Sequence, residues 1–362
     1  MPVVWLIDAY RAGERGQVRA LVDALGWPCE VKQLAYRKAE FIGHVLGQTT
    51  LRGVTAESAA SLQAPWPDLV ISSGVRNEPV CRWIREQSGG RCRYVHVGRP
   101  WADLDSFDLV ITTPQYRVPD RANVLNNRLT LHSVNRQRLS DAAAEWDAEF
   151  ARLPRPLIGV LAGGDSGPFT FGPRAAERLG RQASDLARAR GGSLLVSTSS
   201  RTRGSAAAAL AAAVDVPNYF YEWQAGAAAE NPYFGILAQA DELIVTADSI
   251  AMLSEAAATA KPLHMFDLGG MREGVDLNRD FRLGGMLYAA LMRWCWQALS
   301  RDITRVHQGL VDSGQAVWLG EDPAAVKTPP QSDMQRAVAA VQALLGETGA
   351  SIDVEESGGA VG

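Results

Sequence analysis

The fold is decided by residues 157–167, which read Leu-Ile-Gly-Val-Leu-Ala-Gly-Gly-Asp-Ser-Gly. An uninterrupted apolar run that ends in glycines predicts a strand buried on both faces, followed by a tight loop. A helical pattern over residues 174–190 comes next, so the stretch predicts a strand–loop–helix unit. Because glycine has no side chain, the loop allows backbone N–H groups to approach an anion closely. Residues 163–167 are therefore either a ligand-binding loop or a tight structural turn.

Similar strand–helix pairs recur on both sides of this unit. The predicted strands are Val3–Asp8, Cys29–Leu34, Asp68–Ser73, Arg93–Val97, Leu109–Thr112, Asn123–Leu125, Leu157–Ala162, Leu194–Thr198, Tyr219–Tyr221, Leu243–Thr246 and Leu263–Phe266. Apolar strands that alternate with helices are typical of parallel sheets covered on both faces. The predicted fold class is therefore α/β, with two doubly wound, Rossmann-like parallel-sheet domains that face a cleft.

The proline-rich connector Leu153–Pro156 marks the predicted boundary between the halves, since two prolines in three residues favour an extended chain. We place an N-terminal α/β domain, expected on the acceptor side, at residues 1–153. A nucleotide-diphosphate-binding α/β domain follows at 154–280. Helices at 281–345 are expected to return in part to the first domain. The Gly-, Ser- and Glu-rich tail at 346–362 is predicted to be disordered.

The composition of the chain excludes several functional classes. The 362 residues are 47% apolar and 21% charged, and the net charge is −4. Nucleic-acid binding requires a positively charged surface, and a chain of this net charge is not basic overall. No nucleic-acid partner is therefore expected. The four cysteines form no CxxC pair, which argues against a zinc site or a disulfide framework. The start of the sequence lacks a signal-peptide pattern, and we expect a cytoplasmic location.

The second half carries the residue types that bind a nucleotide diphosphate. Arginines and hydroxyls follow one strand, and a helix start that can hold a diphosphate follows another. A carboxylate within that helix suits a ribose diol. The predicted donor-binding residues are Gly163, Gly164, Asp165, Ser166, Ser199, Arg201, Arg203, Asn231, Tyr233, Asp248, Ser249, Ser254 and Glu255. The alternatives are a solvated polar loop, an ordinary capped helix and simple aromatic packing.

Catalytic candidates lie in the first half, at the ends of two predicted strands. Asp8, Glu14 and His96 are the residues predicted to supply a general base. For His96 the alternative is a structural histidine. The second half, where the donor is expected to bind, carries no DxD motif, so we predict no metal and no cofactor.

The run from 240 to 256, closed by Lys261-Pro262, resembles the mitochondrial-fission Elm-type family and its bacterial relatives. The loops 163–167 and 199–203 and the segment 231–233 match in the same order. This resemblance implies a GT-B-like fold whose second domain holds a nucleotide diphosphate, with a helical Glu on the ribose. Two segments of the first half, 8–17 and Gln115-Tyr116, depart from the family pattern. They leave the acceptor and the catalytic base open.

The function predicted from these features is a metal-independent glycosyltransferase with a nucleotide-diphospho-sugar donor. Its acceptor would be a glycan or a lipid-linked molecule of the cell envelope. The alternatives are a nucleotide-sugar epimerase of the same fold and a non-catalytic scaffold or adaptor. The apolar segment 281–296 is flanked by arginines and is either a buried crossing helix or a membrane-surface patch. The second alternative implies peripheral contact with the inner membrane.

Overall fold

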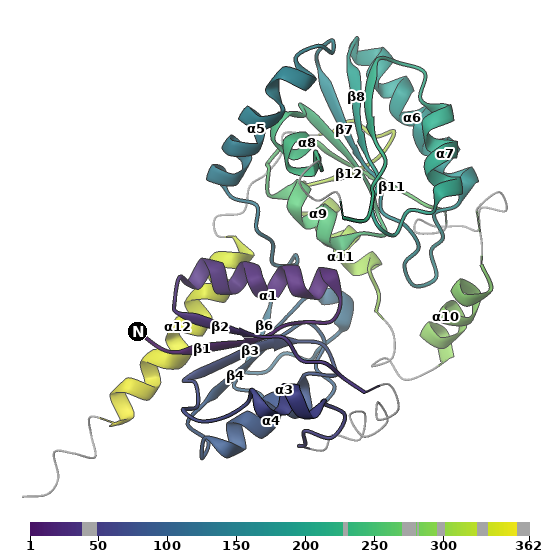
Figure 1. Ribbon diagram of the computed structural model, residues 1–362. Coiled ribbons are helices and arrows are strands. Elements are labelled where there is room, and N and C mark those ends of the chain that lie inside the picture. Colours follow the sequence, from purple (N-terminus) through teal and green to yellow (C-terminus); the bar gives the residue numbers. More distant parts are fainter. Residues whose placement is uncertain are drawn as a thin grey trace, which may run out of the picture. The chain divides into compact units, whose positions relative to one another are not determined.

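The computed structural model describes residues 1–37, 49–226, 231–269, 280, 282–294, 301–323 and 332–352 (Figure 1). Contacts divide the chain into two units. The first contains Met1–Ser133 and Pro330–Gly362, and the second contains Val134–Pro329. Each unit has its own six-stranded sheet, and all strand pairs in both sheets are parallel. The predicted α/β class with two doubly wound parallel sheets is confirmed.

The sheet of the first unit has the strand order β2-β1-β3-β4-β5-β6. Its elements are β1 (Val4–Ile7), α1 (Ala12–Leu25), β2 (Cys29–Lys32), α3 (Ala56–Ala60), β3 (Leu69–Ser73), α4 (Glu78–Gln87), β4 (Arg93–Val97), β5 (Leu109–Thr112), β6 (Val124–Asn126) and α12 (Asp333–Ile352). All residues of β1, β3 and β5 are buried. Their apolar side chains alternate between two clusters, one beneath α1 and α12 and the other beneath α4.

Helix α12 completes the first unit from the far end of the sequence. Its Ala337 and Val341 are fully buried in the cluster that contains Leu21 of α1. The helix continues to Ile352. The predicted disordered tail at 346–362 therefore overlaps the last turns of α12, and residues 353–362 lie outside the described residues.

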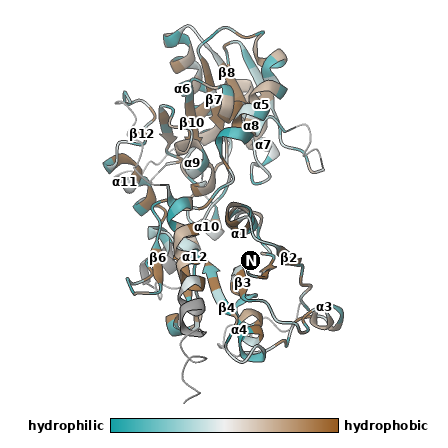
Figure 2. Ribbon diagram, turned by 90° about the vertical axis from the view of Figure 1, so that its left-hand side faces the viewer, coloured by the Kyte–Doolittle hydropathy of each residue, from teal (hydrophilic) through white to brown (hydrophobic). Residues whose placement is uncertain are grey.

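The sheet of the second unit has the strand order β12-β11-β10-β7-β8-β9. Its elements are α5 (Arg136–Phe150), β7 (Leu157–Leu161), α6 (Pro173–Arg190), β8 (Ser193–Ser197), α7 (Gly204–Ala213), β9 (Asn218–Tyr221), α8 (Tyr233–Gln239), β10 (Glu242–Thr246), α9 (Ile250–Ala257), β11 (Leu263–Phe266), α10 (Leu283–Trp294), α11 (Thr304–Asp312) and β12 (Val317–Trp318). The two-residue β12 was not predicted. Figure 2 shows hydrophobic residues gathered along the strands.

Helix α5 belongs to the second unit, whereas the predicted boundary at 153 assigned it to the first domain. It begins after Asn135, whose side chain accepts a hydrogen bond from Arg138 N at 2.9 Å. Trp146 of α5 then packs so closely on α8 that a Cβ at Gly235 would lie 2.5 Å from its ring. This packing, which sequence periodicity does not reveal, places α5 on the second sheet.

Among the described residues, no helix is long and apolar enough to cross a membrane. The same residues contain no group of three or more His, Cys, Asp or Glu side chains that would hold a metal ion.

Candidate functional site

The candidate site lies at the carboxyl edge of the second sheet, where the strand order reverses between β7 and β10. In open α/β sheets, ligands bind outside the carboxyl ends of the strands at such a switch point. The loops after these two strands are joined by hydrogen bonds. Gly163 N donates to Thr246 Oγ1 at 2.7 Å, and Gly164 N donates to Asp248 Oδ2 at 3.0 Å. The strand ends therefore form one connected surface.

Neighbouring loops pack so closely on the β7 loop that Gly163 and Gly164 leave no space for a side chain. A Cβ at Gly163 would lie 2.6 Å from both Asp248 carboxylate oxygens, and a Cβ at Gly164 would lie 2.1 Å from the Arg201 carbonyl oxygen. The Ser199 hydroxyl donates to Gly163 O at 3.1 Å, so the β8 loop is also held here. Two amides that we expected to contact an anion are thus used within the protein.

Four arginines surround this connected surface. Arg201 Nη1 lies 2.8 Å from Asp248 Oδ2, whose side chain is fully buried. Arg203 forms an ion pair with Asp165, and Arg282 Nε lies 3.8 Å from the same carboxylate. The remaining arginine, Arg301, donates to the Ser166 hydroxyl. These contacts bring together four guanidinium groups and two carboxylates, so the cluster is suited to an anion.

Two of these arginines were missed by sequence reasoning. Arg282 Nη2 donates to Gly167 O at 3.0 Å. Arg301 N donates to the Tyr288 hydroxyl at 3.1 Å, and the Tyr288 ring lies 3.1 Å from a Cβ placed on Gly167. The only signal in the sequence was their position at the ends of the apolar segment, which we had interpreted as a crossing helix or a membrane patch.

The N-terminus of α9 faces this edge without a side-chain cap. Ser249 occupies the N-cap position but its side chain makes no capping hydrogen bond. The Asp248 carboxylate is directed instead at Gly164 N and Arg201. Among the described residues, no side chain accepts a hydrogen bond from the first-turn amides, and together with the helix dipole these amides favour an anion.

One predicted donor residue has no access to a ligand. Ser254 is fully buried, and its hydroxyl donates to Ile250 O at 2.7 Å within α9. We therefore withdraw Ser254 from the donor-binding residues. Its neighbour on the helix is Glu255, which has a different environment.

Glu255 accepts a hydrogen bond from the Tyr233 hydroxyl. Burial raises the pKa of Glu255, and the contact with Tyr233 and the charge of Arg138 oppose that rise. Asn231 Oδ1 accepts from Tyr233 N at 3.1 Å, which fixes the start of α8. Tyr233 is thus a partner of the carboxylate.

In the first unit, the switch point lies between β1 and β3, and the first two predicted bases are near it. Asp8 forms ion pairs with Arg15 at 3.3 Å and Arg19 at 2.7 Å. Glu14 Oε1 lies 3.6 Å from Arg11 Nη1. A Cβ placed on Gly74 would lie 3.0 Å from Glu14 Oε2. Both carboxylates therefore lie beside a guanidinium group.

His96, the third predicted base, is a structural histidine. The ring is fully buried, and Nε2 donates to Arg99 O at 3.0 Å, because a carbonyl oxygen only accepts. Nδ1 then accepts from the Tyr94 hydroxyl at 3.0 Å. Burial lowers the pKa of His96 to about 4. Since neither ring nitrogen remains for a substrate, we withdraw His96 as a catalytic base.

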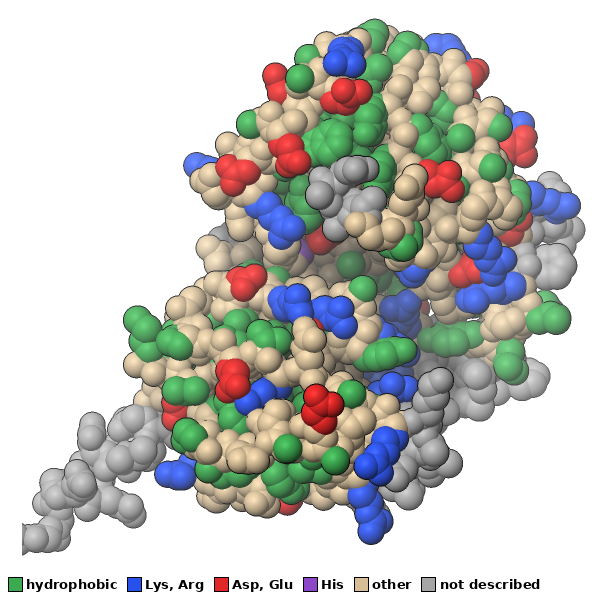
Figure 3. Space-filling view, viewed as in Figure 1, with side chains coloured by type: hydrophobic (Ala, Val, Ile, Leu, Met, Phe, Trp, Pro, Cys, Tyr) green, Lys and Arg blue, Asp and Glu red, His purple; other side chains and the backbone are tan. Residues whose placement is uncertain are grey.

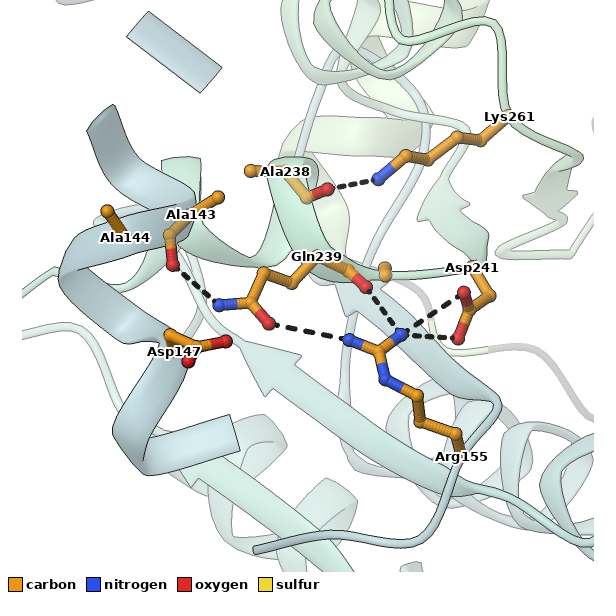
Figure 4. Close-up of a pocket in the computed structure, with 9 residues that line it drawn as sticks. Ala143, Ala144, Asp147, Arg155, Ala238, Gln239, Asp241 and Lys261 are labelled. Carbon is orange, nitrogen blue, oxygen red and sulfur yellow. Dashed lines mark hydrogen bonds and ion pairs between the residues drawn. The ribbon is translucent and has the colours of Figure 1, made fainter. Parts of the chain in front are cut away.

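A pocket of about 740 Å³ in the second unit lies at the opposite edge of the sheet, where β7, β10 and β11 begin (Figure 4). Arg155, Gln239 and Lys261, which line it, are bound to neighbouring protein groups. Arg155 Nη1 lies 3.0 Å from Asp241 Oδ2, and Lys261 Nζ donates to the carbonyl oxygens of Leu237 and Ala238. Burial lowers the pKa of Lys261 to about 8. The two basic side chains of this pocket are thus bound within the protein, and the pocket is separate from the arginine cluster.

A family model described as mitochondrial fission ELM1 matches residues 12–282, about three quarters of the chain. The chain belongs to the mitochondrial fission ELM1 family. The matched range includes the switch point of the second unit and every predicted donor residue. The resemblance to this family that residues 240–256 indicated is confirmed.

Two related proteins differ from this chain at most positions of their sequences. The mitochondrial fission protein ELM1 of Arabidopsis thaliana is 26% identical in an alignment 240 residues long that covers 60% of this chain and 56% of the plant protein. The protein RP120 of Rickettsia prowazekii (strain Madrid E) is 23% identical over 295 residues, 73% of this chain and 82% of that protein. The chain thus spans little more than half of the plant relative.

The fold is GT-B-like, with one doubly wound parallel sheet in each unit. A solved structure that shares it is Os79 from O. sativa, in complex with U2F and trichothecene. The TM-score is 0.50 at 10% identity, over 94% of this chain and 99% of the rice protein. This likeness concerns the fold alone.

Proposed function

We propose that this ELM1-family chain is a metal-independent glycosyltransferase that binds a nucleotide-diphospho-sugar at the carboxyl edge of the second sheet. One observation carries the proposal. Four arginines and the uncapped N-terminus of α9 meet at the switch point between β7 and β10. A diphosphate matches both the charge of this cluster and its supply of N–H donors.

In the proposed mechanism, Arg201, Arg203 and the α9 amides stabilise the negative charge that develops on the leaving diphosphate. Fixed dipoles and guanidinium groups perform this task without a cation because they are already oriented. Glu255 accepts hydrogen bonds from the ribose diol, with Tyr233 holding the carboxylate in position. The acceptor is a glycan or a lipid-linked molecule of the cell envelope, and transfer takes place in the cytoplasm or at the inner membrane.

The ribose contact is tested by isothermal titration calorimetry with UDP, GDP and ADP. We expect Glu255→Ala to weaken binding of the preferred nucleotide by about 1.5–3 kcal/mol, because a charged hydrogen-bond acceptor is lost. Glu177→Ala is the matched control, since Glu177 lies half-exposed on α6 in an ion pair with Arg181. Equal affinity of the two variants would remove Glu255 from the site. If none of the three nucleotides bound to the wild-type protein, the proposal would be overturned.

A non-catalytic adaptor that retains the nucleotide site is the second candidate. It is favoured by the first unit, where His96 is fully engaged and Asp8 is bound by two arginines. The two candidates differ in turnover. A glycosyltransferase releases nucleotide from its donor sugar and continues to do so in EDTA, whereas an adaptor binds the nucleotide and releases none. Activity that is lost in EDTA would contradict metal independence.

A further inference from the structure

Helix α10 presents three large apolar side chains to solvent. Leu283 is 83% exposed, Met286 is 58% exposed and Leu287 is 64% exposed. Their spacing of three and four residues places them on one side of the helix. No other helix in the described part of the chain exposes three large apolar residues. Figure 3 shows hydrophobic side chains on the surface at the position of α10. We call Leu283, Met286 and Leu287 the apolar stripe.

The opposite side of α10 is fixed to the β7 loop. Gly285 approaches the backbone so closely that a Cβ there would lie 2.9 Å from Pro168 O. The Tyr288 ring packs at Gly167, and its hydroxyl accepts from Arg301 N at 3.1 Å. These contacts orient the helix, so the apolar stripe faces outward because the opposite side is already occupied.

The charge of this segment favours an anionic lipid surface over another kind of partner. Over the length of α10, Leu283–Trp294, the sequence contains no Asp or Glu but contains Arg293 and Trp294. Positions 290, 291 and 294 are Ala, Leu and Trp, which continue the spacing of the apolar stripe in the sequence. Apolar residues with arginines and tryptophans are typical of helices that lie in the interfacial plane of a bilayer.

We propose that α10 is a membrane-surface helix that inserts its apolar stripe into a bilayer containing anionic lipids. The helix lies in the plane of the membrane, since no helix among the described residues is long enough to cross it. Insertion covers apolar area that is otherwise in water, and the positive charge of Arg293 adds attraction to anionic headgroups that salt screens. The proposal is independent of sugar transfer. Because α10 contacts Gly167 and Pro168, membrane binding would place the β7 loop beside the lipid surface.

The test is flotation of the full chain with vesicles of phosphatidylcholine mixed with phosphatidylglycerol, and with vesicles of phosphatidylcholine alone. We expect the wild-type protein to float with the anionic vesicles at low salt and to be released at high salt. The triple variant Leu283→Gln, Met286→Gln, Leu287→Gln should bind anionic vesicles at least about tenfold more weakly. Val3→Gln is the control, since Val3 is 50% exposed in the first unit and should leave binding unchanged.

Three results would overturn the proposal. The first is a wild-type protein that does not float with anionic vesicles. The second is a triple variant that floats as well as the wild type. The third is a triple variant whose melting temperature falls, which would show that the stripe packs against protein. Nucleotide affinity of the triple variant is measured in parallel, so that loss of membrane binding is distinguished from failure of the sugar-donor proposal.

Discussion

At the scale of single residues, Gly164 shows how closely the site loops pack. A Cβ at this position would lie 2.1 Å from the Arg201 carbonyl oxygen, whereas a Cβ at Gly204 on α7 would meet nothing within 4 Å. We expect Gly164→Ala to lower the free energy of unfolding by about 1–3 kcal/mol, since backbone must shift to admit the methyl group. Gly204→Ala should have no such cost. Urea unfolding checks both variants, and equal stability would contradict the observed packing.

Glu78 is the residue whose ionisation should be visible in the stability of the protein. Its carboxylate is buried and accepts from Trp101 N and Ala102 N, and burial raises its pKa from 4.5 to about 7. Between these two pH values the folded chain holds a proton on Glu78 that the unfolded chain has lost. The contribution of this group to stability therefore falls as the pH rises through this window. His96 Nε2 lies 3.7 Å from Glu78 Oε1. The pKa of His96 is lowered to about 4, so its ring loses a proton at a lower pH than Glu78 does.

Glu78→Gln should remove this pH dependence, because an amide does not titrate and its oxygen still accepts from both amides. We expect the free energy of unfolding of the variant, minus that of the wild type, to rise by about 2–3 kcal/mol between pH 4.5 and 7. Glu57→Gln, at an exposed position of α3, is the control. The difference is measured by chemical unfolding across that pH range. A constant difference would show that folding does not raise the pKa of Glu78.

At the scale of elements, α12 is the helix on which the first unit depends. The Asp333 carboxylate accepts from Arg128 N at 3.1 Å and Leu129 N at 2.8 Å, which anchors the start of the helix. Val341 is fully buried in the core, whereas Gln342 beside it is exposed. We expect Val341→Asp to cost more than about 3 kcal/mol of stability, because a carboxylate would be buried without a partner.

Gln342→Asp adds the same charge to the exposed side of α12 and should be nearly neutral. Both variants are compared by urea unfolding, with nucleotide affinity as the measure of the second unit. Nucleotide binding should persist in Val341→Asp, since Val341 lies in the first unit. If the two variants unfolded at the same urea concentration, the helix would not belong to the core.

At the scale of the whole molecule, the division into units follows from packing between distant segments. The chain passes from the first unit to the second after Ser133 and returns at Pro330. The proline-rich connector at 153–156, which we predicted as the boundary, lies between α5 and β7 within the second unit. The boundary could not be predicted from local sequence, because the position of α5 depends on the contact of Trp146 with Gly235.

The sequence by itself determined the strands. A short apolar run bounded by polar or glycine residues is buried on both faces only as a strand of a doubly wound sheet. All eleven predicted strands are present, and only the two-residue β12 is additional. The sequence also placed the loops after β7, β8 and β10 at one edge. The return of a C-terminal helix to the first domain was also expected from the sequence. Tertiary structure alone decided that the amides of Gly163 and Gly164 bind the protein, and that Arg282 and Arg301 join the arginine cluster. These features depend on contacts between residues far apart in the chain, which no local pattern of hydrophobicity specifies.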